Sequence, residues 1–197
     1  MGDTSPKFIL REGEINLAIK TIDRNTEIVI RNNTHGGFFY ESRTQDMVID
    51  LNEYGDEDRV LFGELVKNAS RLRKVLNNLN IVIVEVISDE DVTIKDVVER
   101  LKIQKAYEEL LELMDETLDN VDYIPDDIVS EFVLESSAAD IEKIFDKKKS
   151  SLHFTVAEAI TELYKTDEVF DINKMHVVSR FLNYRNPNDY WNEVEKL

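Results

Sequence analysis

The spacing of the hydrophobic residues changes near residue 92, and this change constrains the fold more than any other feature of the sequence. Before it, short runs of β-branched and aromatic residues are separated by turn-forming residues; after it, apolar residues recur every three or four positions. The first spacing is typical of strands and the second of amphipathic helices. We therefore expect an α+β protein, with a mostly antiparallel β module over residues 1–92 that holds one or two helices, followed by an all-helical module over residues 93–197.

An antiparallel meander is expected in the first module. Four segments have strand character and are separated by polar or glycine-containing turns: Glu14–Lys20, Glu27–Arg31, Gly37–Ser42 and Asp46–Leu51. A helix is expected between Leu61 and Leu79. The continuous apolar run Ile81–Ile87 then predicts a strand that is covered on both faces.

Capping residues mark two helix starts in the second module. Thr93 is followed three positions later by Asp96, which predicts a short helix to about residue 101, and Ser137 with Asp140 repeats the pattern. Other helices are expected over Ala106–Thr117, from Pro125, over Val156–Tyr164 and over Val177–Leu182. The single tryptophan, Trp191, is expected to dock the last segment against the core.

The composition excludes several classes of protein. The 197 residues contain no cysteine, so disulfides and cysteine-rich zinc sites are excluded, and 42% hydrophobic residues suffice for a packed core. No apolar run reaches the roughly 18 residues of a membrane span, and charged residues interrupt the first twenty positions. We expect a cytoplasmic protein without membrane attachment.

Catalytic and cofactor-binding patterns are missing. The glycine pair Gly36 and Gly37 is not followed by the Lys-Ser or Lys-Thr of a phosphate-binding loop, and His35, His153 and His176 have no metal-site spacing. We therefore expect a protein that is not an enzyme and that uses no metal or other cofactor.

Negative charge is the strongest feature of the composition. The net charge of -17 disfavours direct binding to nucleic acids, and the window Ala106–Glu142 holds thirteen acidic residues and no Lys or Arg. Like charges at helical spacing cost a few tenths of a kcal/mol each, which a basic partner would relieve. A face that is merely solvated is the equally open alternative. The candidate partner-binding residues in this window are Glu108, Glu109, Glu112, Asp115, Glu116 and Asp119.

A second acidic patch and two aromatic residues complete the candidate partner-binding set. The patch follows the strand that ends at Leu51 and consists of Glu53, Asp56, Glu57 and Asp58. Phe38 and Tyr40 lie in the segment Phe38–Tyr40, where side chains alternate across a sheet, so at least one aromatic residue is expected to face outwards as an interface anchor. Packing in the core is the alternative for each of them.

Residues 26–170 resemble a family of proteins from phages of Gram-positive bacteria. The shared features are the stretch Arg31–Thr34 with a glycine after it, the stretch Phe62–Leu65, and a capped helix that carries Asp96–Val98. The resemblance implies a non-catalytic regulator that acts in the host cytoplasm. Its partner would be the carboxy-terminal domain of the host's primary sigma factor within RNA polymerase holoenzyme, and its effect would be to inhibit or redirect host transcription. The alternative is a structural or assembly protein of the phage virion.

Overall fold

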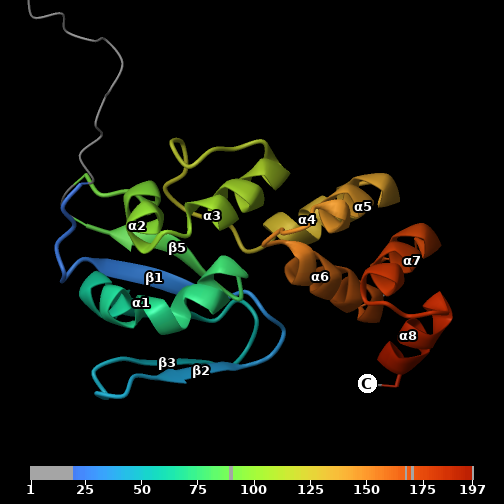
Figure 1. Cartoon of the computed structure of the whole chain (residues 1–197), viewed down its shortest axis with the longest axis horizontal. Coiled ribbons are helices and arrows are strands. Elements are labelled where there is room, and N and C mark those ends of the chain that lie inside the picture. The colour runs from blue at the N-terminus through green and yellow to red at the C-terminus, as the bar shows by residue number, and fades with distance from the viewer. Residues whose placement is uncertain (1–19, 89–90, 167, 170, 197) are drawn as a thin grey trace, which may run out of the picture.

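The computed structural model describes residues 20–88, 91–166, 168–169 and 171–196, and its fold is α+β (Figure 1). The strands are β1 (Glu27–Asn32), β2 (Phe38–Glu41), β3 (Val48–Leu51), β4 (Glu57–Leu61) and β5 (Ile81–Ile87). The helices are α1 (Phe62–Asn77), α2 (Ile94–Leu101), α3 (Gln104–Leu111), the 3-10 turn η1 (Glu112–Met114), α4 (Ile128–Glu135), α5 (Ala138–Asp146), α6 (His153–Lys165), α7 (Ile172–Phe181) and α8 (Pro187–Val194). The predicted order, antiparallel strands with one helix and then helices, is confirmed.

The strands do not form the expected meander. β1 is the centre of a three-stranded antiparallel sheet in the order β4-β1-β5, whereas β2 and β3 pair only with each other. Ile28–Asn32 is buried along its whole length, so β1 needs a neighbour on each side, and β4 and β5 provide them. The meander prediction missed β4 because its charged start, Glu57–Arg59, reads as a turn. Most of the predicted strand Glu14–Lys20 lies outside the described residues.

The first four residues of β5 are covered on both faces, as the apolar sequence predicts, whereas Glu85 and Ile87 are exposed. Residues Ile81–Val84 are all buried, and both α1 and α2 contact the strand. The register between β1 and β5 shifts near Ile30, and at this irregularity the N–H of Ile83 donates a hydrogen bond of 2.6 Å to the phenol oxygen of Tyr107 on α3. Helix α3 therefore completes the hydrogen bonding of the sheet, and α2 and α3 belong to the same packed unit as the strands.

The Arg31–Asn33 stretch at the end of β1 is a structural junction. The buried Asn32 side chain donates to the carbonyl oxygens of Gly36 and Glu53, so it fixes the turn after β1 against the turn before β4. Asn33 donates to the carbonyl oxygen of Leu79, which has a positive φ at the end of α1. The hydrogen bonds of Asn32 and Asn33 to the surrounding turns therefore give these residues a role in the fold.

The remaining helices lie to one side of the strands in Figure 1. The caps at Thr93 and Ser137 are present, each as a reciprocal capping box with the predicted aspartate. The helix expected to start at Pro125 begins only at Ile128. Trp191 on α8 is 4% exposed, its indole N–H donates to the carbonyl oxygen of Met175, and its ring contacts Tyr164, so it docks the last helix as predicted.

None of the helices in the described ranges combines the length and the apolar character needed to cross a bilayer.

Candidate functional site

The acidic surface is built on α3 and the chain that follows it. Ala106, Tyr107, Leu110 and Leu111 fill the core, so the opposite face of α3 turns to solvent and carries Glu108. The predicted helix Ala106–Thr117 is shorter than expected. Helix α3 ends at Leu111 and is followed by the 3-10 turn η1. Asp115 then adopts a left-handed backbone conformation, through which a right-handed helix cannot continue.

An open hollow of about 650 Å³ lies over this surface. Seven carboxylates and two lysines line it together with Thr117 and Leu118. The carboxylates are Glu99, Glu108, Glu109, Glu112, Asp115, Glu116 and Asp119, so all six residues predicted in this window meet in one depression. We call it the acidic hollow; its lysines are Lys95 and Lys105.

Glu109 has a structural role and is not a surface contact. It is only 8% exposed, and its carboxylate accepts hydrogen bonds from the Ser150 hydroxyl at 2.9 Å and the Ser151 N–H at 2.7 Å, with Lys105 3.3 Å away. Burial alone would raise the pKa of Glu109, but the bonds from Ser151, Ser150 and Lys105 outweigh it and lower that pKa. The carboxylate holds the start of α6 against α3.

Two other acids of the hollow have partners within the molecule. Glu112 lies 3.4 Å from the ammonium of Lys147, and Asp119 lies 2.6 Å from that of Lys95. The remaining four, Glu99, Glu108, Asp115 and Glu116, are exposed and make no ion pair with any described residue. Exposed ion pairs are worth little and exchange readily, so the hollow keeps a strong negative potential centred on these four acids.

A groove with both apolar and acidic walls adjoins the acidic hollow across η1. Its volume is about 320 Å³, and its lining includes Leu113, Met114 and Phe132. Asp127, Glu131 and Glu135 add carboxylates to the same lining. Acidic and apolar surfaces therefore meet on both sides of Leu113 and Met114.

The second predicted patch is partly used by the fold. Asp56 accepts hydrogen bonds from the N–H groups of Asn52 and Glu53 and so closes the turn before β4. Glu57 lies 3.5 Å from the buried guanidinium of Arg31. Glu53 and Asp58 make no ion pair within the described ranges. None of these four acids lines the acidic hollow.

The predicted aromatic anchors face the protein interior. Phe38 and Tyr40 pack against the core, and the Tyr40 hydroxyl donates to Asn68 on α1. Phe39 between them is 64% exposed. The sequence predicted that side chains alternate across β2. It did not show which of them face outwards, because that depends on which face of the strand α1 covers.

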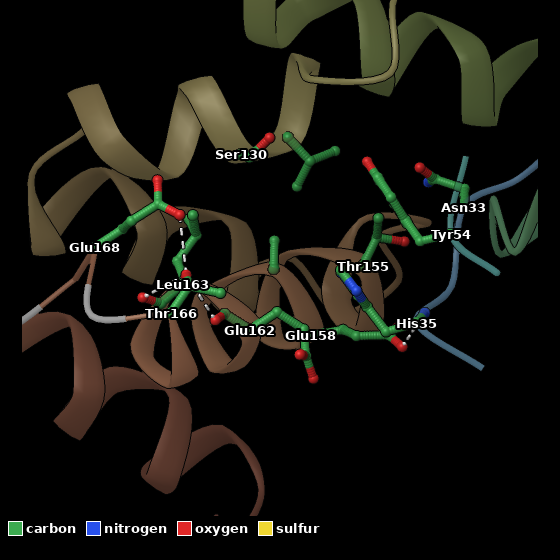
Figure 2. Close-up of a pocket in the computed structure, with 12 residues that line it drawn as sticks. Asn33, His35, Tyr54, Ser130, Thr155, Glu158, Glu162, Leu163, Thr166 and Glu168 are labelled. Carbon is green, nitrogen blue, oxygen red and sulfur yellow. Dashed lines mark hydrogen bonds between the residues drawn. The ribbon is translucent and has the colours of Figure 1, made fainter.

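A smaller pocket, which the sequence did not indicate, lies at the junction of the strand-rich and helical parts (Figure 2). Its volume is about 200 Å³. The His35 ring stacks on the Tyr54 ring at a centroid distance of 4.5 Å. The main-chain N–H of His35 donates a hydrogen bond to the carboxylate of Glu158 on α6. Figure 2 shows Asn33, His35 and Tyr54 at one end and Glu162, Thr166 and Glu168 at the other. Contacts between residues more than 100 positions apart form this pocket, so no local sequence pattern could have predicted it.

The polar groups of this junction pocket are engaged in holding the fold. The hydroxyls of Ser130, Thr155 and Thr166 donate to backbone carbonyl oxygens, and the phenol of Tyr54 donates to the carbonyl oxygen of Asp126. Burial raises the pKa of that phenol above its usual value. No hydroxyl of the pocket is hydrogen-bonded to a histidine in the part of the chain that the structure describes.

The described residues include no group of three or more His, Asp or Glu side chains placed to hold a metal ion. Comparisons with protein-family models, with curated proteins and with solved structures found no match for this chain.

Proposed function

We propose that the protein is a non-catalytic binding protein whose acidic hollow receives a basic surface of another protein. The observation that carries this proposal is the convergence of Glu108, Asp115 and Glu116 in one depression, where none of the three makes an ion pair with a described residue. Such a surface steers a basic partner towards it and repels nucleic acids. The apolar side chains of the groove across η1, which include Leu113, Met114 and Phe132, supply area from which water is expelled on binding, which charge alone does not provide.

The partner we propose is the carboxy-terminal domain of the primary sigma factor of a Gram-positive host. The sequence resemblance motivates this choice. A domain of that kind reads promoter DNA with a helix-turn-helix, whose DNA-facing side is basic and therefore complementary to the acidic hollow. Occupying that side would inhibit or redirect transcription without any chemical step.

The test is a titration of the purified sigma domain with the full chain at several salt concentrations. The triple variant Glu108→Gln, Asp115→Asn, Glu116→Gln removes three charges with little change in shape. It is expected to bind at least tenfold more weakly, on the order of 1.4 kcal/mol, and with a flatter salt dependence. The matched control, Glu41→Gln, Asp50→Asn, Asp91→Asn, removes three exposed charges outside the hollow and should bind normally.

Equal weakening by both triple variants would mean that overall charge, and not the hollow, drives binding. Absence of binding by the unaltered chain would reject the sigma domain as the partner. Affinity capture from host lysate followed by mass spectrometry would then identify which basic protein takes its place.

A second candidate function is that of a virion assembly protein. It is favoured by the two-stranded β2–β3 ribbon, where Phe39 and Val48 are 64% and 49% exposed and share one face. Exposed apolar side chains on a ribbon with free edges are typical of surfaces that join copies together. Sedimentation separates the two functions, because an assembly protein forms oligomers that Phe39→Ser dissociates, whereas a regulator stays monomeric.

A further inference from the structure

A basic hollow lies at the start of α1, on a protein whose net charge is -17. Its volume is about 330 Å³, and its charged lining consists of Lys20, Arg24, Lys67 and Arg100. No carboxylate belongs to the lining formed by the described residues. Acids outnumber Lys and Arg by 41 to 24 in the whole chain. The four cationic side chains in the lining, with no acid among them, therefore make this depression positively charged on a negatively charged protein.

Close packing of the main chain shapes this basic hollow. The N–H of Gly63 donates to the carbonyl oxygen of Arg24 at 2.9 Å, and a Cβ on Gly63 would lie only 2.9 Å from the Cβ of Arg24. Glycine therefore lets the Arg24 main chain lie directly across the first turn of α1. The N–H of Phe62 is bonded to the carbonyl oxygen of Thr26, so side chains, aided by the helix dipole, supply the positive potential.

The four cations are unequally compensated. Lys20 lies 3.7 Å from Asp96 and Lys67 lies 3.3 Å from Asp46. Arg24 and Arg100 make no ion pair with any residue that the structure describes. Two guanidinium groups thus share a concave surface without a carboxylate partner, an arrangement that an anion between them would stabilise.

We infer that the basic hollow binds the phosphate groups of a small soluble molecule that carries two or more linked phosphates. The planar fork of a guanidinium matches phosphate oxygens in a bidentate manner, and Thr21 adds a hydroxyl to the lining. A small anion is favoured over an extended polyanion because the acidic surface elsewhere repels a long phosphate chain. This inference is independent of the proposed function, since no residue of the acidic hollow takes part.

Calorimetric titration of the full chain with inorganic pyrophosphate at constant low ionic strength tests the inference. Saturable binding of one pyrophosphate per chain is expected, and Arg24→Gln with Arg100→Gln should weaken it at least tenfold. The control pair Arg73→Gln with Arg185→Gln removes the same charge from exposed positions outside the basic hollow. It should leave the affinity within twofold, and matching circular dichroism and melting curves establish that both variants fold.

A second measurement locates the ligand. In amide NMR spectra, pyrophosphate should shift the signals of Gly63 and Val66 at the hollow and not that of Glu108. Absence of saturable binding at millimolar pyrophosphate, or equal weakening by the two variant pairs, would overturn the inference. Co-sedimentation with phosphatidylglycerol vesicles that Arg24→Gln with Arg100→Gln abolishes would overturn the soluble ligand in favour of a lipid headgroup.

Discussion

The guanidinium of Arg31 lies 3.0 Å from the carbonyl oxygen of Ile124, a residue 93 positions later in the chain. Arg31 is only 3% exposed and also donates to the carbonyl oxygen of Pro125. In the same segment, the Ile124 N–H donates to Val84 on β5 and Tyr123 forms a β-bridge with Glu85. This short segment between the acidic hollow and α4 is thus held against the sheet by main-chain and side-chain bonds together.

Replacing Arg31 by Met is expected to destabilise the protein by about 3 kcal/mol, because one buried and one partly buried carbonyl oxygen lose a charged donor. Denaturant unfolding measures the loss. The exposed partner offers a control: Glu57→Gln removes the other half of the ion pair at the surface and should cost less than about 1 kcal/mol. Equal costs for the two variants would show that the ion pair, and not the carbonyl bonds, matters.

Tyr107→Phe is expected to cost about 1–3 kcal/mol, because the buried N–H of Ile83 loses its acceptor without any change in packing. Thermal unfolding and amide hydrogen exchange at Ile83 measure the effect. The comparison variant is Tyr184→Phe, which removes a surface hydrogen bond to Glu193 and should leave stability nearly unchanged. A neutral Tyr107→Phe would contradict the role of this phenol in the sheet.

Gly63→Ala is expected to destabilise the protein by about 1–3 kcal/mol, since the new Cβ meets the Arg24 main chain at 3.0 Å. The gain in helix propensity, at most about 1 kcal/mol, does not offset this contact. Gly36→Ala is the matched control: no atom lies within 4 Å of its Cβ position, so stability should change by less than about 0.5 kcal/mol. Melting temperatures of the two variants decide the point.

Asp140 is expected to contribute to stability at neutral pH and not in strong acid. The hydrogen bond from Lys143, followed by those from Ser137, lowers the pKa of Asp140 from 3.8 to about 2. A pKa lowered by folding means that the ionised group stabilises the protein above about pH 4 and that this contribution disappears as the pH falls towards 2. The melting temperature of Asp140→Asn should therefore lie below that of the original chain at pH 7 and coincide with it near pH 2. Lys143→Gln should reproduce most of this pattern.

Local patterns predicted the parts of the fold that depend on neighbouring residues. The capping boxes at Thr93 and Ser137 need only residues three positions apart, and the apolar run Ile81–Val84 at the start of β5 already indicates a covered segment. The pairing of β1 with β4 could not be predicted in this way. The charged residues at the start of β4 do not have the pattern of a strand. The place of β4 in the sheet depends on the burial of β1 on both sides, which is a property of the folded protein.

The site shows the same division. The clustering of acids after Ala106 was visible in the sequence, and six of them do meet in the acidic hollow. The burial of Glu109 was not visible, because its partners Ser150 and Ser151 lie about 40 positions away. The basic hollow was also missed, since Arg24 and Arg100 are separated by most of the strand-rich part.

The burial of Trp191 makes this protein a natural optical reporter of its own last helices. As the only tryptophan, it sits against Tyr164 on α6 and the Met175 carbonyl on α7. Selectively excited fluorescence therefore follows the detachment of α8, while far-ultraviolet dichroism averages over every strand and helix. If the two signals change at the same denaturant concentration, the strand-rich and helical parts, which the bonds of Arg31 and His35 connect, unfold as one cooperative unit.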